Sequence, residues 1–91
     1  MIATPTQGYF MYTKSNCSYC KKAKRHFPQA IVVNCDDYLK EDREGFLLFI
    51  DTLTCMKPRT FPMIFHDQQF LGGYDDTKHL CINVCTFNEK F

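Results

Sequence analysis

The sequence contains no tryptophan, only four glycines and four prolines, and no long hydrophobic run. Its longest wholly apolar stretch, residues 46–50, is far below the roughly 20 residues that span a bilayer, so we expect no transmembrane segment. Too little glycine and proline is present for a low-complexity tail. Neither charge sign dominates, since 11 Lys and Arg stand against 10 Asp and Glu. We therefore expect no nucleic-acid partner and no membrane-surface partner.

A secretory signal is also missing, because no positive segment followed by an apolar stretch opens the chain. We therefore expect the cytoplasm or another reducing compartment. The alternative comes from the cysteine count, since six cysteines in 91 residues also occur in secreted scaffolds stapled by disulfides. Those scaffolds lack an adequate core, whereas 45% of this chain is hydrophobic. A chain this short forms one domain, 1–91, since chains divide only beyond about 250–300 residues.

The first half of the chain predicts strand, helix and strand. Residues 8–13 are apolar on both faces, as in a buried central strand. Residues 31–33 are β-branched and predict a second buried strand. Between them lies a helical pattern from Ser18, so the two strands are expected to be parallel with a right-handed crossover. The expected apolar stripe of that helix has residues four apart: Tyr19, Ala23 and Phe27.

The second half predicts helix, hairpin and helix. Residues 41–53 show helical periodicity, with acidic residues in the first turn. Residues 63–65 and 70–71 predict a hairpin, followed by a double glycine. The expected class is α/β in the order βαβαββα, a four-stranded mixed sheet flanked by helices. The last helix is expected to bury Leu80, Cys81, Val84 and Cys85.

The sharpest feature is Cys-Ser-Tyr-Cys at 17–20, between the first strand and the first helix. Unpaired backbone N–H groups and the helix dipole favour an anion at a helix start, and thiols placed there ionise at lower pH than a free cysteine. We therefore expect Cys17 to attack as a thiolate. Cys20, one turn inside the helix, is expected to be less exposed and to resolve the product. Three nearby cations add positive potential: Lys14, Lys21 and Lys22.

Zinc binding is the main alternative for this pair. A structural zinc ion takes four ligands, usually as two close pairs, and Cys81 and Cys85 could supply the second pair. Those two residues lie on the expected apolar stripe, where cysteine behaves as a small hydrophobe. A CxxC motif inside a βαβ unit is instead typical of redox exchange.

Two further motifs follow. Thr-Phe-Pro at 60–62 places a proline at the start of a strand, where a cis peptide is one option and an ordinary trans proline is the default. Gly-Gly-Tyr-Asp-Asp at 72–76 predicts a turn with Asp75 or Asp76 as helix cap. It equally suits a backbone site for a ligand carboxylate, with an aspartate left to meet an ammonium group.

Together, in this order and spacing, the three motifs resemble the glutaredoxin family over roughly residues 8–84. The family patterns are Cys-Pro-Tyr-Cys, Thr-Val-Pro with a cis-proline, and Gly-Gly-x-Asp-Asp. The resemblance implies the thioredoxin-like fold of glutaredoxins. It also implies an enzyme, a glutathione-dependent oxidoreductase that reduces protein–glutathione mixed disulfides and protein disulfides. The thioredoxin motif Trp-Cys-Gly-Pro-Cys is absent.

The resemblance further implies where glutathione binds. Its cysteine residue is expected to pair with the backbone of Phe61. Its glycine carboxylate is expected to meet Lys14 and Arg59, and its γ-glutamyl end the segment after the double glycine. The remaining implied contacts are Tyr19, Thr60, Pro62, Gly73, Asp75 and Asp76.

Ser18 departs from the family pattern, because it stands where most members have proline. Some glutaredoxins with such a change hold a [2Fe–2S] cluster between two monomers. The four thiolates that a cluster needs would be one Cys17 and one glutathione per monomer. The alternative to a monomeric enzyme with disulfide-containing or glutathionylated partners is therefore a cluster-bridged dimer. Cys35 and Cys55 are candidates for an accessory disulfide or for glutathionylation.

Overall fold

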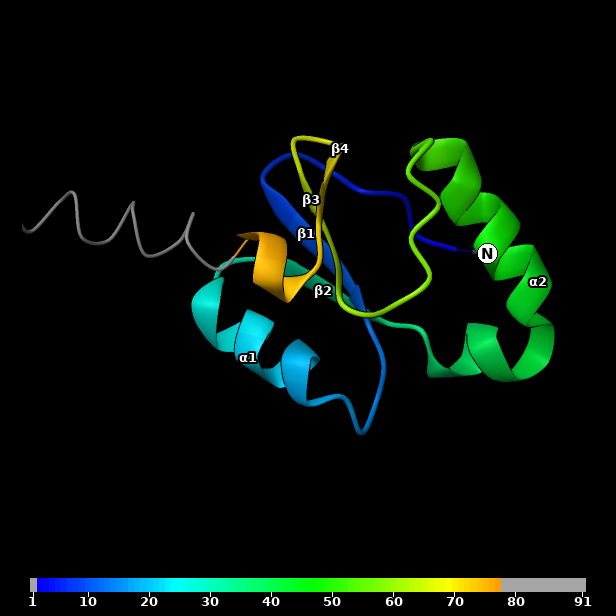
Figure 1. Cartoon of the computed structure of the whole chain (residues 1–91), viewed down its shortest axis with the longest axis horizontal. Coiled ribbons are helices and arrows are strands. Elements are labelled where there is room, and N and C mark those ends of the chain that lie inside the picture. Colours follow the sequence, from blue (N-terminus) through cyan, green and yellow to red (C-terminus); the bar gives the residue numbers. More distant parts are fainter. Residues whose placement is uncertain (1, 78–91) are drawn as a thin grey trace, which may run out of the picture.

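The computed structural model describes residues 2–77 of the chain (Figure 1). The stripe expected at residues 80–85 lies outside this range. Two helices and four strands are followed by a helical turn over 74–77. The elements are β1 (Tyr9–Thr13), α1 (Ser18–His26), β2 (Ile31–Asn34), α2 (Asp36–Leu53), β3 (Met63–His66) and β4 (Gln69–Gly72). None of these described helices is long and apolar enough to cross a membrane.

The sheet has the strand order β2-β1-β3-β4. β1 and β2 are parallel, as expected for strands joined through a helix. β1 pairs antiparallel with β3, and β3 with β4. The β3–β4 turn passes through Asp67 and Gln68, both with positive φ. The mixed four-stranded sheet predicted from the sequence is therefore present.

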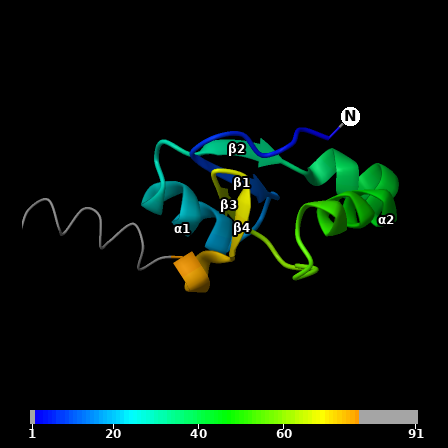
Figure 2. The ribbon, with the colours of Figure 1, turned by 90° about the horizontal axis from the view of Figure 1, so that it is seen from above.

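Alternate residues of β1 face opposite sides of the sheet, because side chains on a strand alternate. Phe10 and Tyr12 are buried in one cluster with Phe46 and Ile50 of α2. Met11 lies in the other cluster, with Ala23 of α1. Figure 2 shows α1 and α2 on either side of the strands. Both faces of β1 are thus covered, which explains why its sequence is apolar without alternation.

Strand β2 differs from expectation, because it is not buried. Ile31 is 49% exposed and Val32 is 40% exposed, since β2 is an edge strand that pairs only with β1. A β-branched run indicates a strand but not the number of its neighbours. The stripe of α1 is also shifted, since Tyr19 is 48% exposed while Cys20 is 1% exposed.

Helix α2 begins at Asp36, before the predicted start at 41, and has a break at Asp42. The backbone of Asp42 is non-helical, with φ −157° and ψ 74°. Its carboxylate accepts a hydrogen bond of 3.0 Å from the N–H of Gly45. Asp42 thus caps the second segment of the helix, which is the segment that the periodicity of 41–53 indicated.

Candidate functional site

Cys17 is the N-cap residue of α1, with extended backbone angles (φ −124°, ψ 106°). Its Sγ accepts a hydrogen bond of 3.2 Å from the backbone N–H of Cys20. Its carbonyl accepts from the N–H of Lys21 at 3.2 Å, which closes the first helical turn. The side chain is half-buried. A sulfur at this position meets an N–H group that has no partner within the helix.

Cys20 lies behind Cys17 and is only 1% exposed. Burial, the largest cause, and the hydrogen bond and charge of Cys17 raise the pKa of Cys20 to about 12. Cys20 therefore keeps its proton at neutral pH. The form of cysteine that attacks a disulfide is the thiolate. Of the two sulfurs, Cys17 is the one placed to react with a partner from solution.

The segment before β3 approaches this pair from the other side. The peptide bond between Phe61 and Pro62 is cis, the option that the sequence had left open. The Sγ of Cys17 donates to the carbonyl oxygen of Phe61 across 3.8 Å. The backbone just before the proline is therefore within reach of anything bonded to the Cys17 sulfur.

A groove of about 340 Å³ runs beside these residues. This volume lies within the range of small-molecule sites in proteins. Three separate segments line the groove: the first turn of α1, the residues around the cis-proline, and the residues after β4. The lining residues are Tyr19, Thr60, Phe61, Pro62, Gly73, Tyr74, Asp75 and Asp76. Apart from Tyr74, each of these was a candidate contact on sequence grounds.

The acidic end of the groove is held by local hydrogen bonds. The carboxylate of Asp76 accepts from the N–H of Gly73 at 3.2 Å, and the hydroxyl of Thr77 donates to the carbonyl of Gly73 at 2.8 Å. The helical turn begins at Tyr74, so Gly73 precedes the helix and the prediction of an Asp75 or Asp76 cap is wrong. The reason is that Asp76 lies inside the first helical turn, where its carboxylate accepts the N–H of Gly73, the residue that precedes the helix. Both carboxylates remain exposed.

Aromatic rings form one rim of the groove. The rings of Tyr19 and Tyr74 have centroids 6.0 Å apart. The Nζ of Lys22 lies 5.2 Å from the Tyr19 centroid and 6.0 Å from that of Tyr74. Tyr74 was not among the predicted contacts, although it stands inside the motif at 72–76. Only the approach of this motif to α1 makes it part of the rim.

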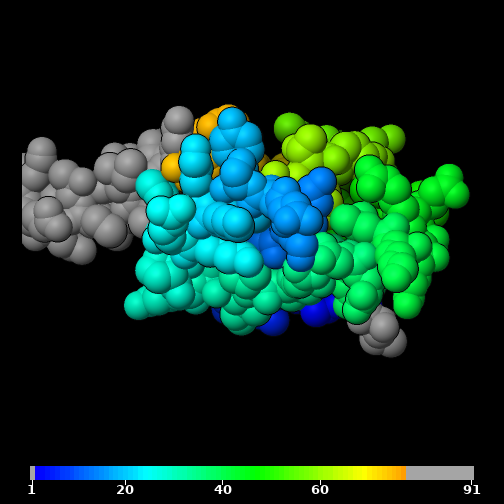
Figure 3. Space-filling view, turned by 90° about the horizontal axis from the view of Figure 1, so that it is seen from below, coloured from blue at the N-terminus to red at the C-terminus, as the bar shows by residue number. Residues whose placement is uncertain are grey.

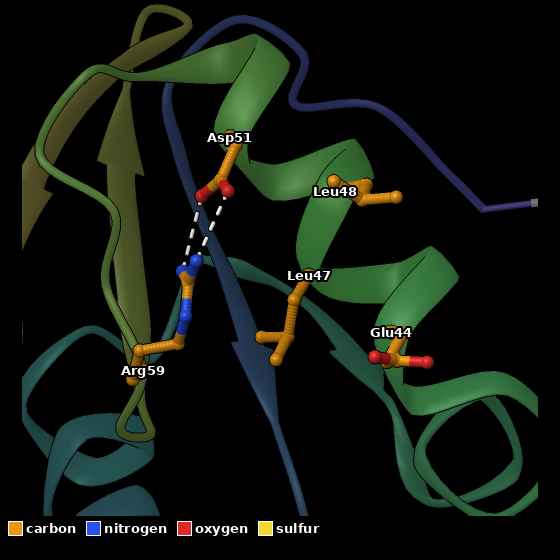
Figure 4. A pocket seen from close by; sticks show the side chains of 5 residues that line it. All are labelled: Glu44, Leu47, Leu48, Asp51 and Arg59. Carbon is orange, nitrogen blue, oxygen red and sulfur yellow. Dashed lines mark hydrogen bonds and ion pairs between the residues drawn. The ribbon is translucent and has the colours of Figure 1, made fainter.

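The two cations expected to meet a ligand carboxylate lie in different places. The Nζ of Lys14 is 5.9 Å from the ring centroid of Phe61, at the groove. Arg59 instead forms two hydrogen bonds of 3.0 Å with the carboxylate of Asp51 on α2 (Figure 4). This pair lowers the pKa of Asp51 and lines a second pocket with Glu44, Leu47 and Leu48. The structure therefore brings Lys14, but not Arg59, to the groove.

The loop before Cys17 is tied to the start of α2. The carboxylate of Asp36 accepts from both the N–H of Ser15, at 2.9 Å, and its hydroxyl. The N–H of Asp36 donates to the side-chain oxygen of Asn34 at 2.9 Å. No local pattern indicates this contact, because it joins residues 21 positions apart. The contact between Ser15 and Asp36 restrains the loop that leads into Cys17.

This contact predicts an acid-sensitive stability. Hydrogen bonds from Ser15, the largest cause, hold the pKa of Asp36 below its usual value. A depressed carboxyl pKa adds stability above the unfolded-state pKa, and that stability is lost as the pH falls toward the folded-state pKa. The variant Asp36→Asn should therefore have a lower urea midpoint at pH 7, with the difference from the natural chain shrinking below about pH 4. Unfolding followed by circular dichroism between pH 3 and 7 measures it. Asp37→Asn, exposed on the same turn, is the matched control, and equal effects at both positions would contradict the assignment.

The other cysteines are separate from the groove. All four described cysteines are free thiols. Cys35 is buried, and its burial raises its pKa to about 12, whereas Cys55 is exposed in the loop after α2. Within residues 2–77, no group of three or more His, Cys, Asp and Glu side chains could hold a metal ion. The second pair of the zinc alternative, Cys81 and Cys85, lies outside the described residues.

The known proteins that are similar to this chain in sequence and in structure are glutaredoxins. No family model matches the chain. The chain is 37% identical over 71 residues to glutaredoxin-1 of Rhizophagus irregularis, covering 78% of this chain and 70% of that protein. It is 36% identical over 67 residues to glutaredoxin-C4 of Arabidopsis thaliana, covering 74% of this chain but only half of that protein's length. The crystal structure of glutaredoxin 1 from Francisella tularensis, complexed with cacodylate, has a TM-score of 0.68 at 26% identity and covers 91% of this chain and 98% of its own.

Proposed function

Because the chain belongs to the glutaredoxin family, we propose that it is a glutathione-dependent thiol–disulfide oxidoreductase with Cys17 as the attacking sulfur. The observation that carries the proposal is the position of Cys17. Its Sγ caps α1, accepts from the Cys20 N–H, and faces the backbone before the cis-proline. The buried partner, Cys20, stays protonated at neutral pH because its pKa is about 12. The sulfur of Cys17 can thus attack a substrate while the sulfur of Cys20 remains a thiol.

For a protein–glutathione mixed disulfide, the exchange runs through glutathionylated Cys17. The Cys17 thiolate attacks the glutathione sulfur, the Cys17–glutathione disulfide forms, and the protein sulfur leaves as a thiolate that takes a proton from water. A second glutathione thiolate then attacks the bound glutathione sulfur. Oxidised glutathione leaves, and the Cys17 thiolate is restored. One glutathione thiol is consumed, because the net reaction exchanges the substrate's mixed disulfide for oxidised glutathione and leaves the protein sulfur as a thiol.

For a protein disulfide, Cys20 completes the reaction. Attack by Cys17 gives a mixed disulfide with the protein, and Cys20 then displaces the protein sulfur to form a Cys17–Cys20 disulfide. Because Cys20 is buried and protonated, it must lose its proton to water before it attacks as a thiolate, and the leaving protein thiolate takes up a proton from water. Two glutathione molecules then reduce the internal disulfide by successive exchange.

The groove offers complementary charges for the two ends of glutathione. Lys14 lies beside Phe61 and suits the glycine carboxylate, while Asp75 and Asp76 suit the γ-glutamyl ammonium group. The backbone of Phe61 is the proposed partner for the cysteine residue between them. Arg59 is already paired with Asp51, so we assign the carboxylate end to Lys14.

This assignment predicts different effects for the two cations. Lys14→Ala should raise the KM for glutathione by about 3- to 5-fold, since one exposed charge pair contributes up to about 1 kcal/mol. Arg59→Ala removes the same charge from the second pocket and should leave that KM unchanged. Steady-state kinetics with varied glutathione measures both. A KM that rises only in the Arg59 variant would reverse the assignment.

The reactivity of Cys17 tests the proposed function most directly. We expect iodoacetamide to alkylate Cys17 faster than the exposed Cys55 at pH 6, because the Sγ of Cys17 accepts the N–H of Cys20 at the helix start. Cys20 should stay unmodified. Peptide mass spectrometry over graded pH measures each site, and incubation with oxidised glutathione should place the adduct on Cys17. Equal reaction rates at Cys17 and Cys55 would overturn the proposal.

The alternative function is a [2Fe–2S]-bridged dimer, favoured by Ser18 as the exposed first residue of α1. Among the cysteines of residues 2–77, Cys17 is the one at the groove whose sulfur is not buried. A cluster, which needs four thiolates and would supply electron transfer or storage, therefore requires two chains and two glutathione molecules. Visible absorption and sedimentation of anaerobically purified chain test this. A colourless monomer with oxidoreductase activity would exclude the alternative.

A further inference from the structure

We propose that the basic face of α1, defined as Lys21, Lys22, Lys24 and Arg25, is a docking surface for protein substrates with acidic residues beside the target cysteine. The inference rests on the proposed function and extends it to the choice of protein substrate. All four side chains are exposed. In Figure 3, the atoms of α1, in light blue and cyan, lie at the surface of this side of the molecule.

Charge is segregated between the two helices. Helix α1 carries four cations and no carboxylate, whereas α2 carries six carboxylates and two cations. The chain as a whole has a net charge of only +1. A low overall charge thus conceals a strongly positive surface, and such a surface attracts negatively charged partners.

The cations of the basic face have no carboxylate partner within residues 2–77. The ion pairs of Arg59 with Asp51 and of His66 with Asp67 involve none of these four side chains. Lys21 precedes Lys24 by three positions and Arg25 by four, so like charges are neighbours on the helix surface. Such like-charge pairs destabilise a helix. An acidic partner would remove this repulsion.

The basic face is continuous with the reactive site. The N–H of Lys21 bonds to the carbonyl of Cys17, and the ammonium of Lys22 lies over the Tyr19 ring at the groove rim. Helix α1 has nine residues and is therefore about 13 Å long. About four extended residues of a substrate span the same length. Acidic residues within about four positions of the target cysteine would meet the face while that cysteine lies at Cys17.

Asp75 and Asp76 limit the direction of docking. They line the part of the groove that follows β4 and would repel an acidic segment lying over them. The preference for acidic residues should therefore depend on which side of the substrate cysteine carries them. If the basic residues served only to complement the helix dipole, the side of the substrate cysteine that carries the acidic residues would not matter.

The test uses the full chain and glutathionylated peptides of one length with acidic, neutral or basic flanks on either side of the cysteine. We expect kcat/KM for the preferred acidic peptide to exceed that of the neutral peptide by about 10-fold at low salt. The ratio should fall toward one at 1 M salt, where the Debye length is about 3 Å. Lys24→Glu/Arg25→Glu should lower the ratio to about one or less. Lys40→Glu/Arg43→Glu on α2, two exposed cations with the same change in net charge, should leave it unchanged.

Binding without chemistry separates this inference from the proposed function. A cysteine-free acidic peptide titrated into isotope-labelled chain should shift the amide signals of residues 21–25, whether or not exchange occurs. Reduction of the neutral peptide without any acidic preference would overturn the docking surface and leave the oxidoreductase intact. Equal losses in the α1 and α2 charge variants, or a duplex DNA that displaces the acidic peptide at lower concentration, would also overturn it.

Discussion

The variant Cys17→Ser is expected to lose reduction of glutathione mixed disulfides by about 1,000-fold or more, the scale on which enzymes lose activity when their nucleophile is removed. A serine hydroxyl is not ionised near neutral pH and cannot replace the thiolate. The substitution should leave the fold intact, because serine is a preferred N-cap and its oxygen can accept the Cys20 N–H that Cys17 now accepts. The loss would therefore be chemical rather than structural.

The Cys17→Ser measurement pairs a glutathione-coupled assay with thermal unfolding. Cys55→Ser is the matched control, since it removes an exposed thiol from the loop after α2 and should keep full activity. Mass spectrometry should show no glutathione adduct on the Cys17 variant after incubation with oxidised glutathione, apart from any at other cysteines. An active Cys17→Ser variant with an unchanged melting temperature would refute the role of Cys17.

The second large effect is a separation of two activities by Cys20→Ala. Reduction of glutathione mixed disulfides should persist, since attack and release both take place at Cys17. Reduction of protein disulfides should fall by about 100-fold, because no internal thiol displaces the protein sulfur and release waits for glutathione from solution. Alanine is chosen because Cys20 is buried, where a serine hydroxyl would need a hydrogen-bond partner.

Insulin-type and glutathionylated substrates, assayed side by side, measure this separation. Trapping adds a second readout, since the Cys20 variant should accumulate mixed disulfides between Cys17 and the substrate protein. Cys35→Ala supplies a control, because it also removes a buried thiol with a pKa raised to about 12 but lies in the cluster facing α2. Equal losses in both variants would mean that the effect comes from packing rather than from resolution.

Local sequence patterns were sufficient for much of this architecture. Continuous apolar runs and β-branching identified the strands, and the CxxC motif opening α1 indicated where a sulfur would meet free N–H groups. The helix start was predictable because hydrogen bonds between near neighbours determine it, as with the Cys20 N–H and Cys17 Sγ, and the strands were predictable because their apolar and β-branched residues form local runs. The helical residues of α2 before the break at Asp42 were missed, since the predicted helix began only at residue 41.

Other features depended on contacts between distant residues. The exposure of β2 follows from its place at the sheet edge, and the pairing of Arg59 follows from the path of its loop along α2. Nothing in the neighbourhood of Ser15 in the sequence indicates Asp36 as its partner. Tyr74 joins the groove rim only because the segment after β4 returns to α1.

The sequence by itself determined the order of the elements and the residues able to do thiol chemistry, because short-range hydrogen bonding and hydrophobic periodicity are encoded locally. Only the tertiary structure decided which of these residues share one groove and which cation stands beside it. Those outcomes depend on how the two helices pack on opposite faces of the sheet, and packing is a property of the whole chain.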